Sequence, residues 1–372
     1  MSATLYAIDD FPFQDYCGIP CALLTNDAAR DSQGVRTTDR LLQGGVNLTL
    51  LLSPEHGLAG ALQAGEEVPD GRDAATGLPV VSLYGKEKSL PEDAWKRFQA
   101  LLIDLPDVGV RYYTYAHTVF QVLKGCAAHG IVASILDRPN PLGKILEGPL
   151  LEPSQRSDVG ACAVPVRHGM SLGEYAGYAH IKEGIIPEAD FVVLSYELPG
   201  KSDQDRPVLF PQFGVPWVPP SPNLPTFEAL CCYPGTCLFE GTNLSEGRGT
   251  AAPFQLVGAP FVDGARVLQA MDHHEFPGLT LEPATFTPTC NKHAGIPCGG
   301  VRFVVTDPVK CRSFAPALEF LEAVRREYPD ALQFNATHFD HLLGSSCYRR
   351  GEESCQQLLA RSEHECRIFN KL

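Results

Sequence analysis

The sequence predicts an α/β protein with a mostly parallel sheet in its first part and a smaller α+β domain after it. Apolar, strand-like runs alternate with amphipathic segments over the first two thirds of the chain, which is typical of βαβ units and a parallel sheet. The 372 residues are too many for one compact core, so two domains are expected. The alternation changes near residue 258, so we expect domains over residues 1–257 and 258–372.

Five apolar runs, several of them stopped by proline or glycine, predict the strands of the first domain. They are 18–26, 46–52, 101–110, 131–141 and 190–197. The helices expected between them have amphipathic patterns, early acids or a closing glycine. They are 35–45, 91–100, 115–130 and 171–184. Residues 201–225 hold too much proline for a helix or an inner strand, so a long ordered loop is expected there.

The second domain is predicted from three segments. Residues 262–276 and 313–330 have the spacing of amphipathic helices, and residues 300–307 alternate as a strand does. This mixture indicates an α+β domain.

The composition excludes several classes of protein. An apolar fraction of 44% and a charged fraction of 20% are those of a globular protein. The net charge of −14 argues against general nucleic-acid binding, which needs a basic surface. No apolar stretch reaches the roughly 18 residues of a membrane span, so no membrane partner is expected. Nothing in the sequence specifies the oligomeric state.

The amino terminus and the cysteines bear on the compartment. The start of the chain has no basic region followed by an apolar one, so it does not read as a secretory signal. The 13 cysteines are scattered without C-x-x-C pairs, which favours free thiols in a reducing cytoplasm. A periplasmic or secreted location is expected only if a leader has been removed.

Charged side chains follow three successive predicted strands at the point where each strand ends. They are Glu55 and His56 after 46–52, Asp104, Asp107 and Arg111 in and after 101–110, and Asp137, Arg138 and Asn140 in and after 131–141. The carboxyl ends of parallel strands meet at one edge of a sheet, where ligands bind. These clusters therefore predict a site, although Asp137 and Arg138 could instead pair with each other and cap a helix.

Two further stretches are polar and rich in glycine. In 166–174, Ser171 and Glu174 have the spacing of a capping box, which explains both of them and leaves His168 without a structural reason. The stretch 240–254 contains four polar candidates, Glu240, Asn243, Glu246 and Arg248. Its glycines allow backbone amides to approach a ligand closely, although a solvated turn is the alternative.

Several motifs are absent from the sequence. There is no G-x-G-x-x-G after a strand, no Walker A sequence and no G-x-S-x-G elbow. No cofactor is therefore expected. The stretches 272–275 (DHHE) and 338–341 (HFDH) hold metal-ligand residue types but are isolated, so no metal site is expected.

Seven stretches, in order, resemble the motifs of the bacterial exo-β-N-acetylmuramidase family, a group of glycoside hydrolases formerly described as a domain of unknown function. They are SPEHG, DVGVRYYTY, LDRPNP, EGP, HGMSLGE, PSPNLPT and EGTNLSEGRGT. The resemblance runs from about residue 23 to near the carboxyl terminus. It implies a Rossmann-like amino-terminal domain and release of N-acetylmuramic acid from the non-reducing end of peptidoglycan. The implied partner is a muropeptide or disaccharide cell-wall fragment.

Glycoside cleavage needs an acid for the leaving oxygen and a group that stabilises the oxocarbenium-like transition state. We assign the acid to Glu55, which the resemblance also implies, and expect His56 to tune it or bind substrate. Asp107 and Asp137 are the leading candidates for the second group. Glu240 and Glu246 remain open, as does a mechanism in which the 2-acetamido group of the sugar is the nucleophile.

The lactyl carboxylate of N-acetylmuramic acid suggests an arginine partner, because the guanidinium fork matches a carboxylate. Arg111, Arg138 and Arg248 lie in motifs. The full set expected to bind substrate is Arg111, Tyr113, Arg138, Asn140, His168, Asn223, Glu240, Asn243, Glu246 and Arg248.

The geometry expected from these assignments is a single cleft. Glu55, Asp107 and Asp137 should line it, His168 and part of 240–250 should close it, and the proline-rich segment should border it. Two other functions remain open: a non-catalytic cell-wall sugar-binding protein on the same fold, and a cofactor-dependent α/β enzyme.

Overall fold

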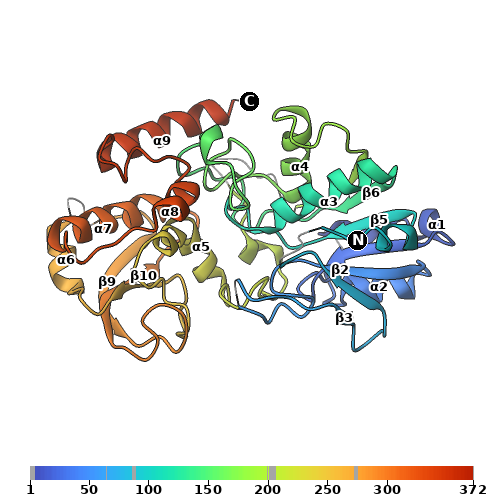
Figure 1. The fold of residues 1–372 in the computed structure, drawn as a ribbon, viewed down its shortest axis with the longest axis horizontal. Coiled ribbons are helices and arrows are strands. Elements are labelled where there is room, and N and C mark those ends of the chain that lie inside the picture. The colour runs from blue at the N-terminus through green and yellow to red at the C-terminus, as the bar shows by residue number, and fades with distance from the viewer. Residues whose placement is uncertain are drawn as a thin grey trace. The chain divides into compact units, whose positions relative to one another are not determined.

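The structure is a computed structural model of the protein. It describes residues 5–63, 65–85, 89–198, 200, 207–271 and 275–371. The chain forms two compact units, each assembled from separate segments (Figure 1). The first unit comprises Met1–Gly109, Tyr113–Lys144 and Gly169–Pro222, and the second comprises Val110–Tyr112, Ile145–His168 and Asn223–Leu372. The expected domain boundary after residue 257 stays a prediction.

The first unit contains a seven-stranded sheet in the order β3-β4-β2-β1-β5-β6-β7. Its strands are β1 Cys21–Thr25, β2 Leu48–Ser53, β3 Gly71–Arg72, β4 Pro79–Ser82, β5 Ala100–Asp104, β6 Val132–Leu136 and β7 Phe191–Leu194. All neighbouring pairs are parallel except β3 with β4. If β3 is left out and the other six strands are renumbered along the chain, this is the Rossmann order 3-2-1-4-5-6. The order in which successive strands are added reverses between β1 and β5, although these two strands are parallel. The predicted mostly parallel sheet is confirmed.

The central strands are continuous apolar runs because both faces of a parallel sheet are covered. All five residues of β1 are buried, and β2 is buried at five of its six positions. The α-helices of this unit are α1 Phe13–Tyr16, α2 Thr37–Gln43, α3 Tyr115–His129 and α4 Leu172–Ile181. Helix α3 ends at Gly130 with φ 64°, a left-handed conformation that favours glycine. Helix α4 begins at Ser171 with the predicted capping box.

The helix predicted over 91–100 is wrong. Only the short 3-10 turn η2, Ala94–Arg97, forms there, because the end of this segment is drawn into the sheet. The amides of Gln99 and Ala100 both donate to the carbonyl of Pro20, and Ala100 begins β5. The other 3-10 turns of this unit are η1 Ala7–Asp10 and η4 Phe210–Phe213. Residues 201–206 of the predicted proline-rich loop lie outside the described residues.

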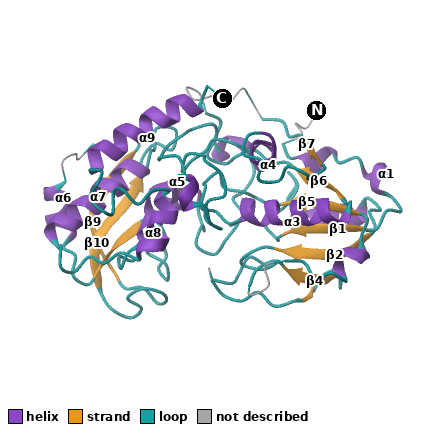
Figure 2. Cartoon of the chain, turned by 45° about the horizontal axis from the view of Figure 1, so that its top comes forward, coloured by secondary structure: helices purple, strands orange, loops and turns teal. Residues whose placement is uncertain are grey.

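The second unit has a three-stranded antiparallel sheet, β8-β10-β9, with helices around it (Figure 2). The strands are β8 Leu256–Ala259, β9 Leu279–Phe286 and β10 Cys298–Val305. The α-helices are α5 Phe227–Thr236, α6 Gly264–Ala270, α7 Phe314–Glu327, α8 Ala336–Leu343 and α9 Cys355–Phe369. The 3-10 turns are η3 Pro153–Gln155 and η5 Cys237–Gly241. The predicted strand 300–307 and helices 262–276 and 313–330 correspond to β10, α6 and α7. Residues 272–274 lie outside the described residues.

Arg111 joins the separate segments of the second unit. Its side chain is buried, and it donates to four backbone carbonyls. Nη1 donates to Pro149 at 2.7 Å and to Val164 at 2.8 Å, and Nη2 donates to Leu342 at 2.9 Å and to Leu343 at 3.1 Å. The planar guanidinium therefore holds backbone from three parts of the chain together.

We predict that Arg111→Lys lowers the free energy of unfolding by about 3 kcal/mol or more, because a lysine cannot reproduce the fork and each unsatisfied buried polar group costs about 1–3 kcal/mol. Urea denaturation measures the change. The exposed Arg302 gives the control Arg302→Lys, which should change stability by less than about 0.5 kcal/mol. Equal stability of the two variants would contradict the structural role of Arg111.

Candidate functional site

The candidate site of the first unit lies at the carboxyl edge of its sheet. Asn26 follows β1, Glu55 follows β2, Asp107 follows β5 and Asp137 follows β6. These four strands run parallel, so their carboxyl ends share one edge. Asn26 and Asp107 flank the place where the strand order reverses, which is where ligands bind in such sheets.

Glu55 is buried and held at both of its oxygens. The hydroxyl of Thr114 donates to Oε2 at 2.7 Å, and the amide of Gly65 donates to Oε1 at 3.2 Å. The next residue, His56, has φ 71°, which is uncommon for a residue with a side chain. Such backbone strain concentrates at functional sites. His56 Nδ1 lies 2.8 Å from the carbonyl of Leu62, and because a carbonyl accepts, this nitrogen carries the proton.

Asp104 and Arg138 form a buried ion pair. Arg138 Nε and Nη2 donate to the two carboxylate oxygens of Asp104 at 2.5 and 2.8 Å. The same guanidinium lies over the ring of Tyr6, 4.4 Å from its centroid, and Asp104 also accepts from the hydroxyl of Thr37 at 2.5 Å. Both charged groups are therefore engaged by the protein.

Asp137 is bonded to the first turn of helix α4. Ser171 Oγ donates to it at 2.6 Å and the amide of Gly173 at 2.9 Å. Burial raises the pKa of Asp137 to about 6 although these hydrogen bonds lower it. The alternative is that Asp137 and Arg138 pair with each other and cap a helix. Asp137 does bond to the start of a helix, but the pairing is wrong, because Arg138 pairs with Asp104.

Asp107 is the least compensated carboxylate of this edge. Its Oδ2 accepts from the amide of Gly109 at 2.8 Å, and its buried Oδ1 has no hydrogen-bond partner within the described residues. Burial raises the pKa of Asp107 to about 7; the bond from Gly109 lowers it and the charge of Asp137 raises it further. Asp107 can therefore carry or release a proton near neutral pH, as a general acid or base must.

The backbone turn that follows Asp107 is tightly packed at Gly109. Gly109 has φ 73°, and a Cβ there would lie 2.2 Å from Nδ2 of Asn140. Asn140 in turn donates to the carbonyl of Met170 at 3.0 Å and accepts from the amide of Leu142 at 2.9 Å. The predicted site residue Asn140 therefore holds the backbone that follows β6 and packs closely against Gly109, which follows β5.

The structure adds Asn26, Thr114 and Tyr115, which the sequence analysis missed. Nδ2 of Asn26 donates to the Tyr115 hydroxyl at 2.8 Å, and that hydroxyl donates to the carbonyl of Pro220 at 2.8 Å. Burial raises the pKa of Tyr115, and the charges of Glu55 and Asp107 raise it further. Both carboxylates therefore act on the same phenol.

Tyr113, a predicted site residue, packs beside Tyr115 with ring centroids 4.5 Å apart. The strand-end rule applied to β1 would have found Asn26. Thr114 and Tyr115 lie at the end of the DVGVRYYTY motif, which could have pointed to them, where a loop becomes helix α3.

The predicted residues of the 240–254 stretch form a closed network in the second unit. Arg248 pairs with Glu240 and, at 3.0 Å, with Glu246, which Lys292 also contacts at 2.9 Å. Burial alone would raise the pKa of Glu240, but Arg248 and a hydrogen bond from His338 lower it to about 2. Glu240 is therefore ionised at neutral pH.

The remaining predicted residues of the second unit are the half-buried Asn243 and the buried His168 and Asn223. Asn243 donates to the carbonyl of Ala331 at 2.8 Å and accepts from the amide of Gln333 at 2.9 Å. His168 and Asn223 are almost fully buried. That these residues close a cleft with Glu55 stays a prediction.

All three arginines expected to bind the sugar carboxylate have partners within the protein. Arg111 holds backbone carbonyls, Arg138 pairs with Asp104, and Arg248 pairs with two glutamates. Their assignment to substrate therefore gains no support from these contacts and stays a prediction.

The part of the chain that the structure describes contains no group of three or more His, Cys, Asp or Glu residues placed to hold a metal. In 338–341, Asp340 is engaged by Arg349 at 2.6 Å, and 272–274 lie outside the described residues. No described helix has the length and apolar character needed to cross a bilayer.

Comparisons with known proteins agree over nearly the whole chain. Family models described as "Exo-beta-N-acetylmuramidase NamZ", N-terminal and C-terminal, match residues 21–228 and 231–372. The peptidoglycan beta-N-acetylmuramidase NamZ of Bacillus subtilis (strain 168) is 38% identical over 355 residues, 94% of this chain and 84% of that protein.

Two solved structures of DUF1343 family proteins from Bacteroides fragilis NCTC 9343 have similar folds, each at 26% identity. One superposes with a TM-score of 0.84 over 98% of this chain and 96% of its own. The other has a TM-score of 0.74 over 99% and 97%.

We predict that the substitution Asp107→Asn stabilises the folded protein, relative to the wild type, by an amount that increases as pH rises. The folded protein keeps a proton on Asp107 up to about pH 7, whereas an unfolded aspartate loses it near pH 4. Wild-type stability from this group is therefore present below pH 4 and lost as pH rises to 7.

Between pH 5 and pH 8 the free energy of unfolding of Asp107→Asn should rise, relative to wild type, by at least about 1 kcal/mol. Denaturant unfolding at both pH values measures this. The exposed Asp10 provides the control Asp10→Asn, which should show little pH-dependent difference. An unchanged difference for Asp107→Asn would contradict the raised pKa.

Proposed function

This chain belongs to the exo-beta-N-acetylmuramidase NamZ family, and from that premise we propose that it hydrolyses peptidoglycan fragments and releases N-acetylmuramic acid from their non-reducing end. The observation that carries the proposal is the buried Glu55, held by Thr114 and Gly65 at the carboxyl edge of a Rossmann-like sheet. A muropeptide or disaccharide from the bacterial cell wall is the proposed substrate, as in cell-wall recycling.

In this mechanism Glu55 protonates the oxygen of the leaving sugar. Its two hydrogen bonds fix the carboxyl group, and a positioned acid accelerates such a reaction by about 10²- to 10⁴-fold. His56 orients the turn that presents Glu55, because its strained backbone and its contact with Leu62 fix that turn.

We assign the second role to Asp107 rather than Asp137. Both carboxylate oxygens of Asp137 accept hydrogen bonds from the start of α4. By contrast, Oδ1 of Asp107 has no hydrogen-bond partner among the described residues. With a pKa near 7, Asp107 can activate water, attack the anomeric carbon, or bond the 2-acetamido group if that group is the nucleophile. Asp137 then acts as a positioning residue that raises the pKa of Asp107.

Two other functions are less favoured. A cofactor-dependent enzyme on this fold needs a phosphate loop that the sequence lacks. A non-catalytic sugar-binding protein would not need a buried carboxyl group with a pKa near 7. Release of a chromophore from an aryl N-acetylmuramide without added cofactor separates the three. All 13 cysteines carry thiols rather than disulfides, which supports the further proposal of a reducing compartment such as the cytoplasm.

We predict that Glu55→Gln folds as the wild type does and loses about 10²- to 10⁴-fold in kcat/KM, because the amide cannot donate the proton. Activity on a substrate with a poor leaving group measures the loss, and circular dichroism checks the fold. Glu188→Gln, at an exposed position of the same unit, is the matched control. Near wild-type turnover by Glu55→Gln would remove Glu55 from the acid role.

We predict that an aryl N-acetylmuramide is hydrolysed with about 10- to 100-fold higher kcat/KM than the matching N-acetylglucosaminide. The second sugar lacks the lactyl carboxylate, and a hydrogen bond to a charged group contributes about 1.5–3 kcal/mol. The lactyl methyl amide is the control, since it keeps the size and removes the charge. Comparable efficiency on all three would refute recognition of that carboxylate.

A further inference from the structure

A cavity of about 620 Å³ lies within the second unit, and none of the residues assigned to the reaction lines it. It is bordered by the amino end of α7, by α9 and by residues 146–148. The lining used below consists of Phe276, Arg312, Phe314, Leu359, Glu363 and Arg367. Its size and its apolar walls with a few charged groups are those of small-molecule sites, which span roughly 300–1,000 Å³.

Arg312 gives this cavity an uncompensated positive charge. Its Nη1 donates to the carbonyls of Val309 and Cys311, both at 3.0 Å, and it forms no ion pair within the described chain. Burial lowers the pKa of Arg312, the nearby charge of Arg167 lowers it further, and the charge of Glu147 opposes both. Because Arg167 is paired with Glu147 at 3.2 Å, an anion entering the cavity would find Arg312 available.

One further feature favours a carboxylate there. Arg367 also lines the cavity and has no ion pair among the described residues. Its neighbour Glu363, one helical turn away, is exposed, and such pairs contribute only about 0.3–0.5 kcal/mol. The amino end of α7 is already engaged, because the amide of Phe314 donates to Oε2 of Glu147 at 3.0 Å, so the arginines are the groups left for a ligand carboxylate.

The other groups restrict the ligand further. Phe276, Phe314 and Leu359 supply apolar walls. Four carboxylates, those of Glu147, Glu275, Glu319 and Glu363, line the same cavity and outnumber its two arginines. A simple polyanion would be repelled by these carboxylates. A ligand with one carboxylate, an apolar side chain and a positive group matches the arginines, the apolar walls and the glutamates respectively.

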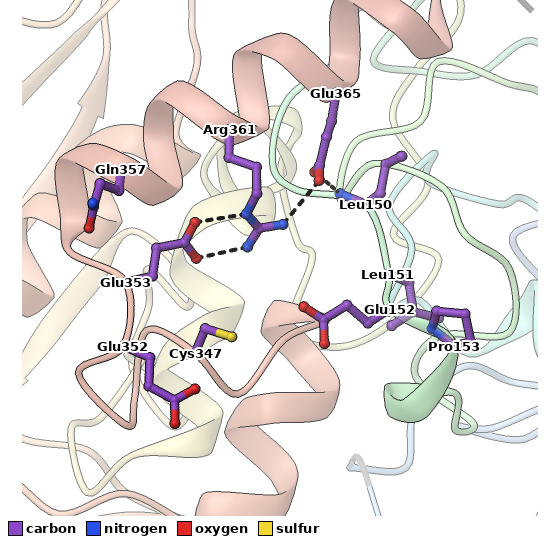
Figure 3. A pocket seen from close by; sticks show the side chains of 10 residues that line it. All are labelled: Leu150, Leu151, Glu152, Pro153, Cys347, Glu352, Glu353, Gln357, Arg361 and Glu365. Carbon is purple, nitrogen blue, oxygen red and sulfur yellow. Dashed lines mark hydrogen bonds and ion pairs between the residues drawn. The ribbon is translucent and has the colours of Figure 1, made fainter.

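A second cavity of similar size in this unit provides a contrast (Figure 3). Its arginine, Arg361, is already neutralised: it contacts Glu353 through two hydrogen bonds of 2.8 and 2.9 Å and Glu365 through one of 3.1 Å (Figure 3). That cavity is therefore acidic without an available cation, and nothing in it selects a ligand.

We propose that the cavity between α7 and α9 binds a short zwitterionic peptide, with its terminal carboxylate on Arg312 and Arg367 and an apolar side chain against Phe314 and Leu359. The proposal goes beyond the hydrolysis reaction and does not depend on it. Its test uses the full chain without any sugar, so its failure leaves the proposed activity untouched.

The experiment is isothermal titration calorimetry with the tripeptide Ala-Leu-Ala. We expect saturable binding, at least tenfold weaker binding of the carboxyl-terminal amide, and at least tenfold weaker binding of Ala-Leu-Ala to Arg312→Gln. Arg302→Gln, which removes an exposed arginine of β10 outside the cavity, should bind as the wild type does. No binding of Ala-Leu-Ala, or equal binding of the acid and the amide, would overturn the proposal.

Thermal unfolding distinguishes a binding role of Arg312 from a structural one. If Arg312 is kept for a ligand, Arg312→Gln removes a half-buried charge without a counterion, and its Tm should equal or exceed that of the wild type. A lower Tm together with unchanged affinity for Ala-Leu-Ala would overturn the proposal.

Discussion

Besides Glu55, three aspartates lie at the carboxyl edge of one parallel sheet, and the proposed chemistry depends on how the protein compensates each of them. Asp104 is neutralised by Arg138, and Asp137 accepts hydrogen bonds from the first turn of α4. Asp107 receives one backbone hydrogen bond, so burial raises its pKa to about 7. Burial thus raises the pKa of Asp107 to about 7 and that of Asp137 to about 6, and tuning of carboxyl pKa values by the surroundings is how an enzyme obtains acids and bases that work near neutral pH.

Much of this edge could be predicted from the sequence, because it follows from local rules. Apolar runs located β1, β2, β5, β6 and β7, and the parallel sheet then required their carboxyl ends to coincide. Glu55, Asp107 and Asp137 were placed on one edge by that reasoning. The capping box at Ser171 was also readable, since it needs only four consecutive residues. The helix over 91–100 failed because a contact with Pro20, far away in the chain, overrode its local pattern.

Partners distant in the sequence could not be predicted. A guanidinium fork fits backbone carbonyls as well as it fits carboxylates, so the motif context of Arg111 did not reveal that it joins separate segments of the second unit. Arg138 pairs with Asp104, 34 residues earlier, rather than with its neighbour Asp137. The division of the chain into two units, each made of segments separated in the sequence, could not be predicted either, because it depends on contacts between distant residues. Tyr115 and Thr114 owe their roles to contacts with Asn26 and Glu55, which no periodicity encodes.

The central claim is that Asp107 holds a proton near neutral pH while lying on the same edge as Glu55. The most direct measurement is the pH dependence of the ¹³C chemical shifts of the carboxyl groups in protein labelled at aspartate, compared with the Asp107→Asn variant. The account predicts one resonance that titrates near pH 7 and disappears in the variant. A wild-type spectrum in which every aspartate resonance titrates below about pH 5 would contradict it.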